Sequence, residues 1–363
     1  MRIALVHEYL NQFGGAERVL QVLCSMFPDA PIYTLFYDPQ ATGGVFEGRE
    51  IRTSFLQRAP FIKKYHYFFP LFMPMAIEQF DFSDFDLVIS ISASFAKGII
   101  TKPNTKHICY CLTPPRFLWD SSHKFREDFS YPSIIKKMLP PFITYVRLWD
   151  REASFRVDDF WTISSFVKDR VNKYYMRDAK VIYPPVNIDK FYISSDIQDY
   201  FLMIGRLVSY KRFDLAIRVF NQLGWSLKIA GVGPEINKLK KVAGNNIEFL
   251  GLVSDDKLAD LYSHTRALIF PQEEDFGITP LEAMASGRPV IAYRGGGAVE
   301  TIKEGETGIF FNEQTEESLM ASLQGFKDQD FNPSACRMQA EGFDIKVFKK
   351  NILKHLDTLT MQG

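Results

Sequence analysis

Hydrophobic residues in the first half of the chain gather in short runs separated by polar turns. Runs of four or five apolar residues are typical of buried strands, and they predict strands at residues 3–6, 32–36, 87–91, 108–112 and 160–163. Between the first two runs, apolar residues recur with the spacing of one helix face, which predicts a helix at residues 15–27. Strands that alternate with helices in this way are typical of a parallel sheet.

The second half of the chain repeats the alternation. Apolar runs predict strands at residues 200–204, 227–230, 247–249, 267–270 and 290–293. Helical spacing between these runs predicts helices at residues 213–223, 255–263 and 280–286. We therefore predict an α/β fold of two doubly wound, Rossmann-like domains that face a cleft at the carboxyl ends of their strands.

The pattern breaks at Tyr183-Pro-Pro-Val-Asn187, where two prolines interrupt the alternation. We predict one Rossmann-like domain at residues 1–190 and a second at residues 191–340. Residues 341–363 form a C-terminal part, and its amphipathic stretch at residues 345–359 predicts a helix that packs back on the N-terminal domain.

Composition narrows the class of protein. The 363 residues are 46% hydrophobic, as in globular proteins, and the formal net charge is zero. Residues 1–195 hold 24 Lys and Arg against 20 Asp and Glu, an excess too weak to indicate nucleic acid but compatible with an anionic surface as partner. The four cysteines are expected to be buried thiols of a reducing compartment. The chain opens directly with a strand, and no apolar run could span a bilayer, so we expect a cytoplasmic protein that can attach peripherally to the inner face of the cytoplasmic membrane.

Two carboxylates, Glu274 and Glu282, stand eight positions apart in a segment that predicts a loop followed by a helix. Thr279, Pro280 and Glu282 fit a capping box with Thr279 as N-cap, so Glu282 could serve the helix alone. A helix N-terminus is also an anion site, which leaves open a second role in which Glu282 binds a ribose and Glu274 a sugar. The backbone amides that would face the anion belong to Phe276, Gly277, Ile278 and Thr279.

Basic and glycine residues follow other predicted strands. Arg206 and Lys211 come after the first strand of the second half, where two cations suit a diphosphate; a solvated basic loop is the alternative. Gly231 follows the next strand and resembles part of a phosphate loop without the full dinucleotide fingerprint. Gly14 and Gly15 open the first helix, where a phosphate site and a simple turn fit the pattern equally well.

Together these segments resemble the retaining glycosyltransferases of the GT-B fold that carry a Glu-x7-Glu signature, the glycosyltransferase family 4-like group. Within that group they are most similar to the bacterial O-antigen mannosyltransferases. The resemblance covers most of the chain. Besides Glu274 and Glu282, it rests on three motifs: Gly14-Gly-Ala-Glu-Arg18, Gly205-Arg206 with Lys211, and Gly295-Gly-Gly297 with Glu300.

The resemblance implies a role for each matching residue. Arg206 and Lys211 would hold the donor diphosphate and Glu274 the hydroxyls of the donor sugar, and these three form the expected catalytic set. Further residues would contact the phosphate, base and ribose of the donor. This expected donor-binding set comprises Gly14, Gly15, Gly231, Leu252, Val253, Phe276, Gly277, Ile278, Thr279 and Glu282.

The chain departs from the family pattern at Leu112. Related enzymes often carry a histidine at this position, near the donor sugar and the acceptor, so the resemblance transfers no histidine role to this chain. His123 lies further along the same segment, and we expect it to be solvated rather than to substitute.

The function that the resemblance implies is retaining, metal-independent transfer of a hexose. Mannose from GDP-mannose is the first choice, onto a lipid-linked (polyprenyl-linked) or polysaccharide glycan in bacterial surface glycan synthesis, such as O-antigen or capsule. The N-terminal domain would take the acceptor and the C-terminal domain the donor. A UDP-sugar or another GDP-sugar as donor, and an inactive subunit that supports a partner transferase, remain alternatives. No cofactor is expected, and a nicotinamide-dependent dehydrogenase is disfavoured because neither half carries the Gly-x-Gly-x-x-Gly fingerprint.

Two further patterns bear on metals and partners. Asp84-Phe-Asp86 has the spacing of a metal-binding motif, but it precedes a predicted strand and lies away from the ligand end, so we expect a structural role and no metal site. Residues 63–70 and 134–149 mix cations with aromatics, which suits an anionic membrane surface and a lipid-linked acceptor. An amphipathic core edge explains the same pattern equally well.

Overall fold

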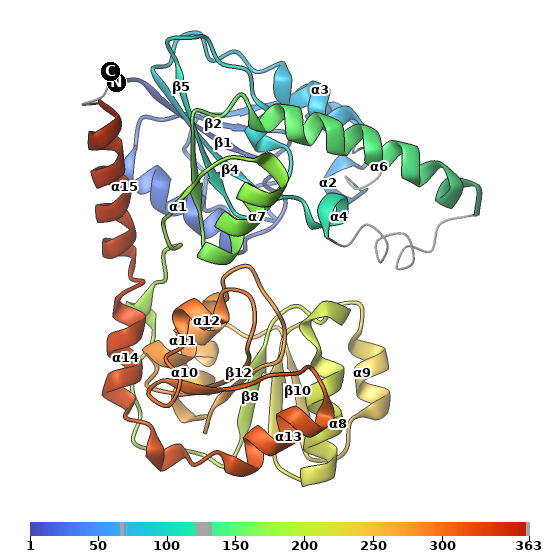
Figure 1. Ribbon diagram of the computed structural model, residues 1–363, viewed down its shortest axis with the longest axis vertical. Helices are drawn as coiled ribbons and strands as arrows, with labels where there is room; N and C mark the ends of the chain where they lie inside the picture. The colour runs from blue at the N-terminus through green and yellow to red at the C-terminus, as the bar shows by residue number, and fades with distance from the viewer. Residues whose placement is uncertain (66–68, 70, 121–132, 361–363) are drawn as a thin grey trace. The chain divides into compact units, whose positions relative to one another are not determined.

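The chain forms two compact units, Met1–Tyr183 and Pro184–Gly363 (Figure 1). The computed structural model describes residues 1–65, 69, 71–120 and 133–360. Each unit is built on one sheet with helices packed against it, and the strand pairings within both sheets are parallel. The predicted class, an α/β fold of two doubly wound halves, is therefore confirmed.

Seven parallel strands form the sheet of the N-terminal unit, in the order β3-β2-β1-β4-β5-β6-β7. The interior strand β1 pairs with β2 and β4, and Ile3 lies opposite Leu87. All six residues of β4 are buried, as expected for a strand that is covered on both faces. The strands are β1 (Ile3–His7), β2 (Ile32–Thr34), β3 (Ile51–Thr53), β4 (Leu87–Ser92), β5 (Lys106–Cys111), β6 (Asp159–Thr162) and β7 (Lys180–Val181).

The helices of the N-terminal unit cover this sheet. Helix α1 buries Val19, Leu20 and Leu23 and packs on β1 and β4. Figure 1 shows α3 and α6 together on one side of the sheet, where Ile77 and Val146 join one apolar core. The helices are α1 (Gly15–Met26), η1 (Phe55–Arg58), α2 (Ile62–Tyr65), α3 (Phe72–Glu78), η3 (Ala96–Gly98), α4 (Arg116–Trp119), α6 (Ser133–Ser154) and α7 (Ser165–Tyr175).

Six parallel strands form the sheet of the C-terminal unit, in the order β10-β9-β8-β11-β12-β13. The first strand in sequence, β8, lies in the interior of the sheet between β9 and β11. The chain thus winds outward from β8 first to one edge and then to the other. The strands are β8 (Phe201–Ile204), β9 (Leu227–Ala230), β10 (Ile247–Gly251), β11 (Leu268–Phe270), β12 (Val290–Tyr293) and β13 (Gly308–Phe311).

Helices flank the second sheet on both sides. Figure 1 shows α8, α9 and α13 on one side and α10, α11 and α12 on the other. The helices are η4 (Ile188–Lys190), η5 (Ser209–Lys211), α8 (Phe213–Leu223), α9 (Ile236–Val242), α10 (Asp255–His264), α11 (Ile278–Ala285), α12 (Ala298–Thr301), α13 (Glu316–Gly325), η6 (Asp328–Asp330), α14 (Pro333–Glu341) and α15 (Ile345–Thr360).

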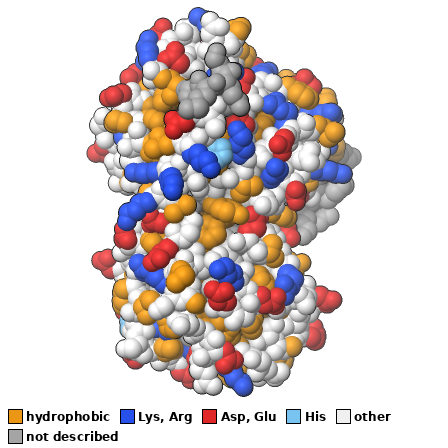
Figure 2. Space-filling model, turned by 60° about the vertical axis from the view of Figure 1, so that its left-hand side comes forward, with side chains coloured by type: hydrophobic (Ala, Val, Ile, Leu, Met, Phe, Trp, Pro, Cys, Tyr) orange, Lys and Arg blue, Asp and Glu red, His pale blue; other side chains and the backbone are white. Residues whose placement is uncertain are grey.

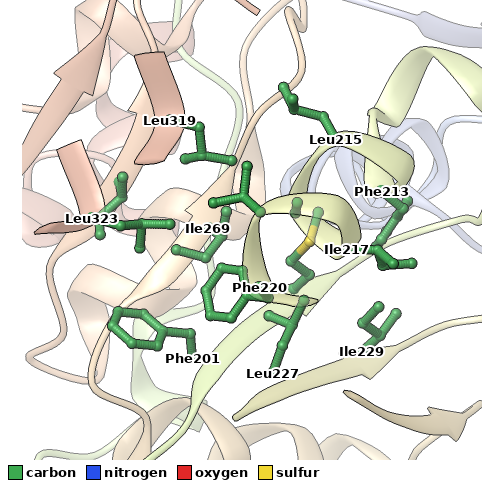
Figure 3. Packing of buried hydrophobic residues seen from close by; sticks show 14 of the residues in the cluster. Phe201, Phe213, Leu215, Ile217, Phe220, Leu227, Ile229, Ile269, Leu319 and Leu323 are labelled. Carbon is green, nitrogen blue, oxygen red and sulfur yellow. The ribbon is translucent and has the colours of Figure 1, made fainter. Parts of the chain in front are cut away.

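The apolar core on the α8 side of the second sheet explains the helical pattern read from the sequence. Phe220 of α8 meets Phe201 of β8 edge to face, with ring centroids 5.3 Å apart. Figure 3 shows Phe220 in the middle of this cluster, beside Leu227, with Leu319 and Leu323 of α13 on the far side of Ile269. The apolar spacing at residues 213–223 is therefore the buried face of α8, and burial of such side chains contributes roughly 1.5–3 kcal/mol each.

The structure confirms the strands predicted from apolar runs, with ends that differ by at most two residues, and adds three that the sequence pattern does not predict. These three are β3, β7 and β13, and each lies at an edge of its sheet. β3 exposes two of its three residues, and β7 is only two residues long. In β3 and β7, partial exposure at the edge explains the lack of a continuous apolar run, whereas β13 carries the apolar residues Ile309, Phe310 and Phe311 and was not recognised.

All four cysteines are buried and free, as the sequence predicts. Burial raises the pKa of the Cys24 thiol to about 11 and that of Cys336 to about 12. Thiols that stay protonated near neutral pH are poor nucleophiles and poor metal ligands, which makes these residues part of the core rather than of a reactive site.

The surface carries both signs of charge. On the face seen in Figure 2, Lys and Arg side chains lie among Asp and Glu side chains, in agreement with a formal net charge of zero. Within the described part of the chain, no helix combines the length and the apolar character needed to cross a membrane.

Candidate functional site

Predicted site residues of the C-terminal unit lie in loops that leave adjacent strands of its sheet. Arg206 follows β8, Gly231 follows β9, and Glu274 lies in the loop between β11 and α11. Because β8 pairs with both β9 and β11, the sheet brings these three loops together along its carboxyl edge, the side at which its strands end. The carboxyl ends of parallel strands are where α/β sheets bind ligands, so this edge is the candidate site.

The loops after β8 and β9 pack backbone against backbone. Gly205 donates its N–H to Ala230 O at 3.0 Å, and Gly231 donates to Gly251 O at 2.8 Å. A Cβ atom on Gly231 would overlap the carbonyl oxygen of Gly205. Gly231 is thus required for the close approach of the two loops, a role that the phosphate-loop interpretation of the sequence did not include. Its predicted contact with a donor stays a prediction.

Lys211 and Glu274 form an ion pair inside the candidate site. Lys211 Nζ contacts Glu274 Oε1, and Gln272 Nε2 donates to the same oxygen at 3.3 Å. The two charged side chains are only 13% and 19% exposed, so water screens their attraction less than on an open surface. Two residues that the sequence placed in different motifs are therefore direct partners.

The remaining cations of this loop divide into one free and one engaged residue. Arg206 is exposed, and its guanidinium has neither an ion pair nor a hydrogen bond with any described residue. Arg212 donates to Gln314 Oε1 at 3.2 Å and lies 3.6 Å from Asp214. Arg206 is accordingly the cation that is available to an anionic ligand, whereas Arg212 holds its own loop in place.

Glycines of the segment after β12 hold the backbone of the Glu274 loop. Gly297 donates its N–H to Glu274 O at 2.8 Å. Gly296 has a left-handed backbone, with φ of 59°, and a Cβ atom there would overlap Glu274 O. A Cβ atom on Gly297 would overlap the Cα atom of Phe276. Gly296 and Gly297 thus have a structural duty, which is to let two loops approach each other at the site.

The helix that carries Glu282 begins earlier than the sequence predicts, and the predicted capping box is wrong. α11 begins at Ile278 with Gly277 as N-cap, without a side-chain cap, so Thr279 lies inside the first turn. The physical reason is the left-handed backbone of Gly277, with φ of 91°, which turns the chain into the helix two residues sooner. Glu282 is 5% exposed, and its Oε2 accepts a hydrogen bond from the Tyr262 hydroxyl at 2.8 Å.

The α11 N-terminus and the end of β10 place the other predicted donor contacts. Phe276 is buried, and Ile278 and Thr279 are the first two residues of α11, whose amides have no acceptor within the helix. Leu252 follows β10 and is 84% exposed, while Val253 is half-buried. An exposed leucine next to the β9 loop fits a contact with a flat base. Tyr262 was not predicted, because no spacing in the sequence links it to Glu282 and only the fold brings the two together.

In the N-terminal unit, Gly14 and Gly15 lie at the start of α1, next to a buried carboxylate, Glu17, that the sequence analysis did not single out. Gly14 donates its N–H to Glu17 Oε2 at 2.7 Å, and Glu17 Oε1 lies 3.9 Å from His7 Nε2. Burial raises the pKa of Glu17 and lowers the pKa of His7 to about 4. The Gly14 amide already has an acceptor, so a phosphate contact at Gly14 stays a prediction and would displace this bond. An acidic residue in the first helical turn is the sequence signal for this arrangement.

A buried polar cluster lies at the carboxyl ends of β1 and β4 and was missed by sequence reasoning. Glu8 Oε1 accepts backbone hydrogen bonds from Ala93 at 2.9 Å and Phe95 at 2.8 Å, and burial raises its pKa. Lys97 forms a buried ion pair with Asp150. The cluster ties the loop after β4 to the first strand and to α6, and it gives these loops a fixed backbone.

The remaining residues that the sequence analysis singled out lie away from the Lys211–Glu274 pair in sequence, and the structure describes most of them. Asp86 lies directly before β4, at the amino end of that strand, and accepts a hydrogen bond from Arg2 N at 2.6 Å. Among the described residues, no group of three or more His, Cys, Asp and Glu side chains could hold a metal ion. Leu112 is half-buried and directly follows β5. His123 lies outside the described residues.

The two segments that mix cations and aromatics are described only in part. Residues 66–68 and 70 and the side chains of 64, 65 and 134–139 lie outside the description. In the rest, Tyr145 and Leu148 of α6 are 59% and 61% exposed. Trp149 instead packs against the core and donates to Glu78 Oε1 at 2.8 Å. The described part of α6 is thus a core edge on one face and an exposed apolar strip on the other.

Comparison with known proteins finds that the chain is similar to glycosyltransferases. The model of the family "Glycosyl transferases group 1" matches residues 187–342, which lie in the C-terminal unit. An uncharacterized glycosyltransferase of Methanocaldococcus jannaschii is 24% identical over 335 residues, covering 89% of this chain and 87% of that protein. An O-antigen chain mannosyltransferase of Salmonella typhimurium is 32% identical over 180 residues, covering 46% of this chain and 49% of that protein.

A solved structure supports the same fold over the whole chain. The crystal structure of Anabaena HepE in complex with UDP superposes with a TM-score of 0.72, covering 99% of this chain and 100% of that one. The sequence identity is 16%, so the likeness concerns the fold alone. Two parallel α/β units in this arrangement of strands are the GT-B fold.

Proposed function

The chain belongs to the group 1 glycosyltransferases of the GT-B fold, and from this premise we propose that it transfers mannose from GDP-mannose to a glycan with retention of configuration. The observation that carries the proposal is the grouping of Arg206, Lys211 and Glu274 at one edge of the C-terminal sheet, beside the N-terminus of α11. This grouping offers cations and backbone amides to a diphosphate and a carboxylate to a sugar.

The reaction follows from where charge develops. The bond between the sugar C1 and the diphosphate oxygen breaks, and the acceptor hydroxyl forms its bond to C1 on the same face. The proton of that hydroxyl leaves with the departing phosphate. Arg206, Lys211 and the first amides of α11 stabilise the negative charge that grows on the diphosphate, which is the charge that limits its departure.

Other residues fit the remaining parts of the donor. Glu282 binds the ribose while it accepts a hydrogen bond from the Tyr262 hydroxyl, because a carboxylate can accept more than one hydrogen bond. Leu252 and Val253 take the base. Mannose is supported by the relative that is an O-antigen chain mannosyltransferase, and a UDP-sugar or another GDP-sugar is the second choice.

The acceptor is a lipid-linked or polysaccharide glycan of the bacterial surface. The exposed Tyr145 and Leu148 on α6 support attachment to an anionic membrane face, from which a lipid-linked acceptor can be reached. Co-sedimentation with anionic vesicles tests this part. Absence of binding at low salt would restrict the acceptor to a soluble glycan.

Replacement of Lys211 by Ala tests the proposed site. We expect Lys211→Ala to lose transfer by about a hundredfold or more, because the growing phosphate charge loses a partly buried cation. The measurement is release of GDP from GDP-mannose with a glycan acceptor, together with circular dichroism to show an intact fold. Lys238→Ala is the control, since Lys238 is an exposed cation on α9.

Near-normal turnover by Lys211→Ala would contradict the site assignment. If the wild-type chain neither transfers nor hydrolyses GDP-mannose, UDP-glucose or other nucleotide sugars, the alternative of an inactive subunit gains support instead. The two outcomes are distinct, because the first concerns one residue and the second the whole activity.

A further inference from the structure

The ion pair between Lys211 and Glu274 joins two residues that the proposed function gives to different parts of the donor. Lys211 is assigned to the diphosphate and Glu274 to the sugar, yet their charged atoms are in contact. A diphosphate that binds Lys211 must therefore share it with, or take it from, the carboxylate of Glu274. We propose that Glu274 competes with the diphosphate for Lys211 and thereby makes the site prefer the nucleotide sugar over the nucleoside diphosphate product.

The fold holds both partners where they meet. Lys211 ends the short helix η5, and its N–H donates to Val208 O at 3.1 Å. The carbonyl of Glu274 accepts the Gly297 N–H at 2.8 Å, and its carboxylate accepts Gln272 Nε2 at 3.3 Å. Because neither backbone is free to move away, the competition for Lys211 is built into the site.

The competition has different consequences for donor and product. Hydroxyl groups of a bound sugar can donate hydrogen bonds to Glu274 and satisfy its carboxylate when Lys211 turns toward the phosphate. A nucleoside diphosphate lacks the transferred hexose and therefore offers Glu274 none of the hexose hydroxyls, and its terminal phosphate carries an additional negative charge. Its binding therefore leaves a partly buried carboxylate without its cation and close to another anion, which is unfavourable.

Arg206 completes the argument, because it lacks the constraint of Lys211. Its guanidinium is exposed and has no partner among the described residues, so it attracts donor and product alike. Selectivity must then come from the paired cation. After transfer, loss of the sugar returns Glu274 to Lys211 and promotes release of the nucleoside diphosphate.

Replacement of Glu274 by Gln tests the inference, which rests on the proposed function of the site. Titration calorimetry measures the affinity of each variant for GDP, UDP and GDP-mannose, without an acceptor. We expect E274Q to bind the nucleoside diphosphate about tenfold more tightly than the wild type, because Lys211 is released to the phosphate. Affinity for GDP-mannose should gain less or fall, since the sugar loses an ionised acceptor.

Two controls separate the pair from a general charge effect. E273Q makes the same change of charge at the neighbouring residue, which is exposed and has no ion pair among the described residues, and it should leave the ratio of the two affinities unchanged within about twofold. In a Lys211→Met background, E274Q should give a clearly smaller gain, because no cation is released and only the direct repulsion between carboxylate and phosphate is relieved.

The outcomes are distinguishable from those that test the function. If the wild-type chain binds neither GDP, UDP nor GDP-mannose, the proposed function itself fails. If the wild type binds and E274Q binds the nucleoside diphosphate no more tightly, the competition is overturned. A gain of undiminished size in the Lys211→Met background, or one that E273Q reproduces, overturns it as well.

Discussion

At the scale of single residues, burial fixes the protonation state of several ionisable groups. His107 in β5 has no exposed surface, and its Nε2 lies 2.8 Å from the Ser90 hydroxyl. The backbone N–H of His107 donates to Asp158 Oδ2 at 2.7 Å. Burial lowers the pKa of His107 from 6.5 to about 3, because the neighbourhood cannot solvate an imidazolium. The folded chain therefore keeps this ring neutral at a pH where the unfolded chain protonates it.

This difference predicts a pH-dependent contribution to stability. The contribution is complete above pH 6.5 and is lost as the pH falls from 6.5 toward 3, since only the unfolded state binds the proton there. We expect the free energy of unfolding of the wild type, minus that of His107→Gln, to fall by about 1.4 kcal/mol per pH unit between pH 6 and pH 4. Urea titrations at several pH values measure it, and a difference that does not change with pH would contradict the buried neutral ring.

At the scale of elements, the site depends on loops that are held by other loops. The segment after β12 supports the backbone between β11 and α11, and the β9 loop packs on the β8 loop through Gly231. Glycine at these contacts removes the Cβ atom that would keep the backbones apart. Such support fixes the backbone that carries Glu274.

Gly296→Ala and Gly305→Ala form a matched pair for this support. Both glycines have left-handed backbones, with φ of 59° and 76°, but a Cβ atom overlaps Glu274 O at Gly296 and meets nothing within 4 Å at Gly305. We expect Gly305→Ala to cost about 1 kcal/mol of stability and to retain transfer. Gly296→Ala should cost about 2–3 kcal/mol and lose most transfer, because the Glu274 loop must shift. Thermal unfolding and GDP release measure the two effects, and equal losses of activity in both variants would refute the supporting role.

At the scale of the whole molecule, the two units each have their own sheet and core, and most proposed donor contacts lie in the C-terminal unit. A ligand that binds only the folded state raises its stability, by about 2.7 kcal/mol at a hundred times its dissociation constant. We expect GDP to raise the unfolding temperature of the full chain equally in EDTA and in Mg²⁺, because Arg206, Lys211 and the α11 amides supply the positive charge. A shift that appears only with Mg²⁺ would contradict metal-independent binding.

Much of the fold follows from the sequence alone, because hydrophobic periodicity is a local property. The apolar runs give the interior strands and α8, and the glycine, cation and carboxylate motifs sit on the loops where they were expected. The edge strands β3 and β7 escaped because their exposed residues break the apolar run. The start of α11 escaped because the left-handed turn at Gly277 overrode a plausible capping pattern.

Tertiary structure decided how the site residues relate to each other. Lys211 and Glu274 are 63 positions apart in sequence, and only the placement of β8 beside β11 brings them together. The Tyr262 bond to Glu282 and the glycine contacts with Glu274 arise in the same way. The sequence by itself determined which chemical groups the protein carries and on which loops. The order of strands, which no local pattern encodes, determined which of those groups neutralise, support or compete with one another.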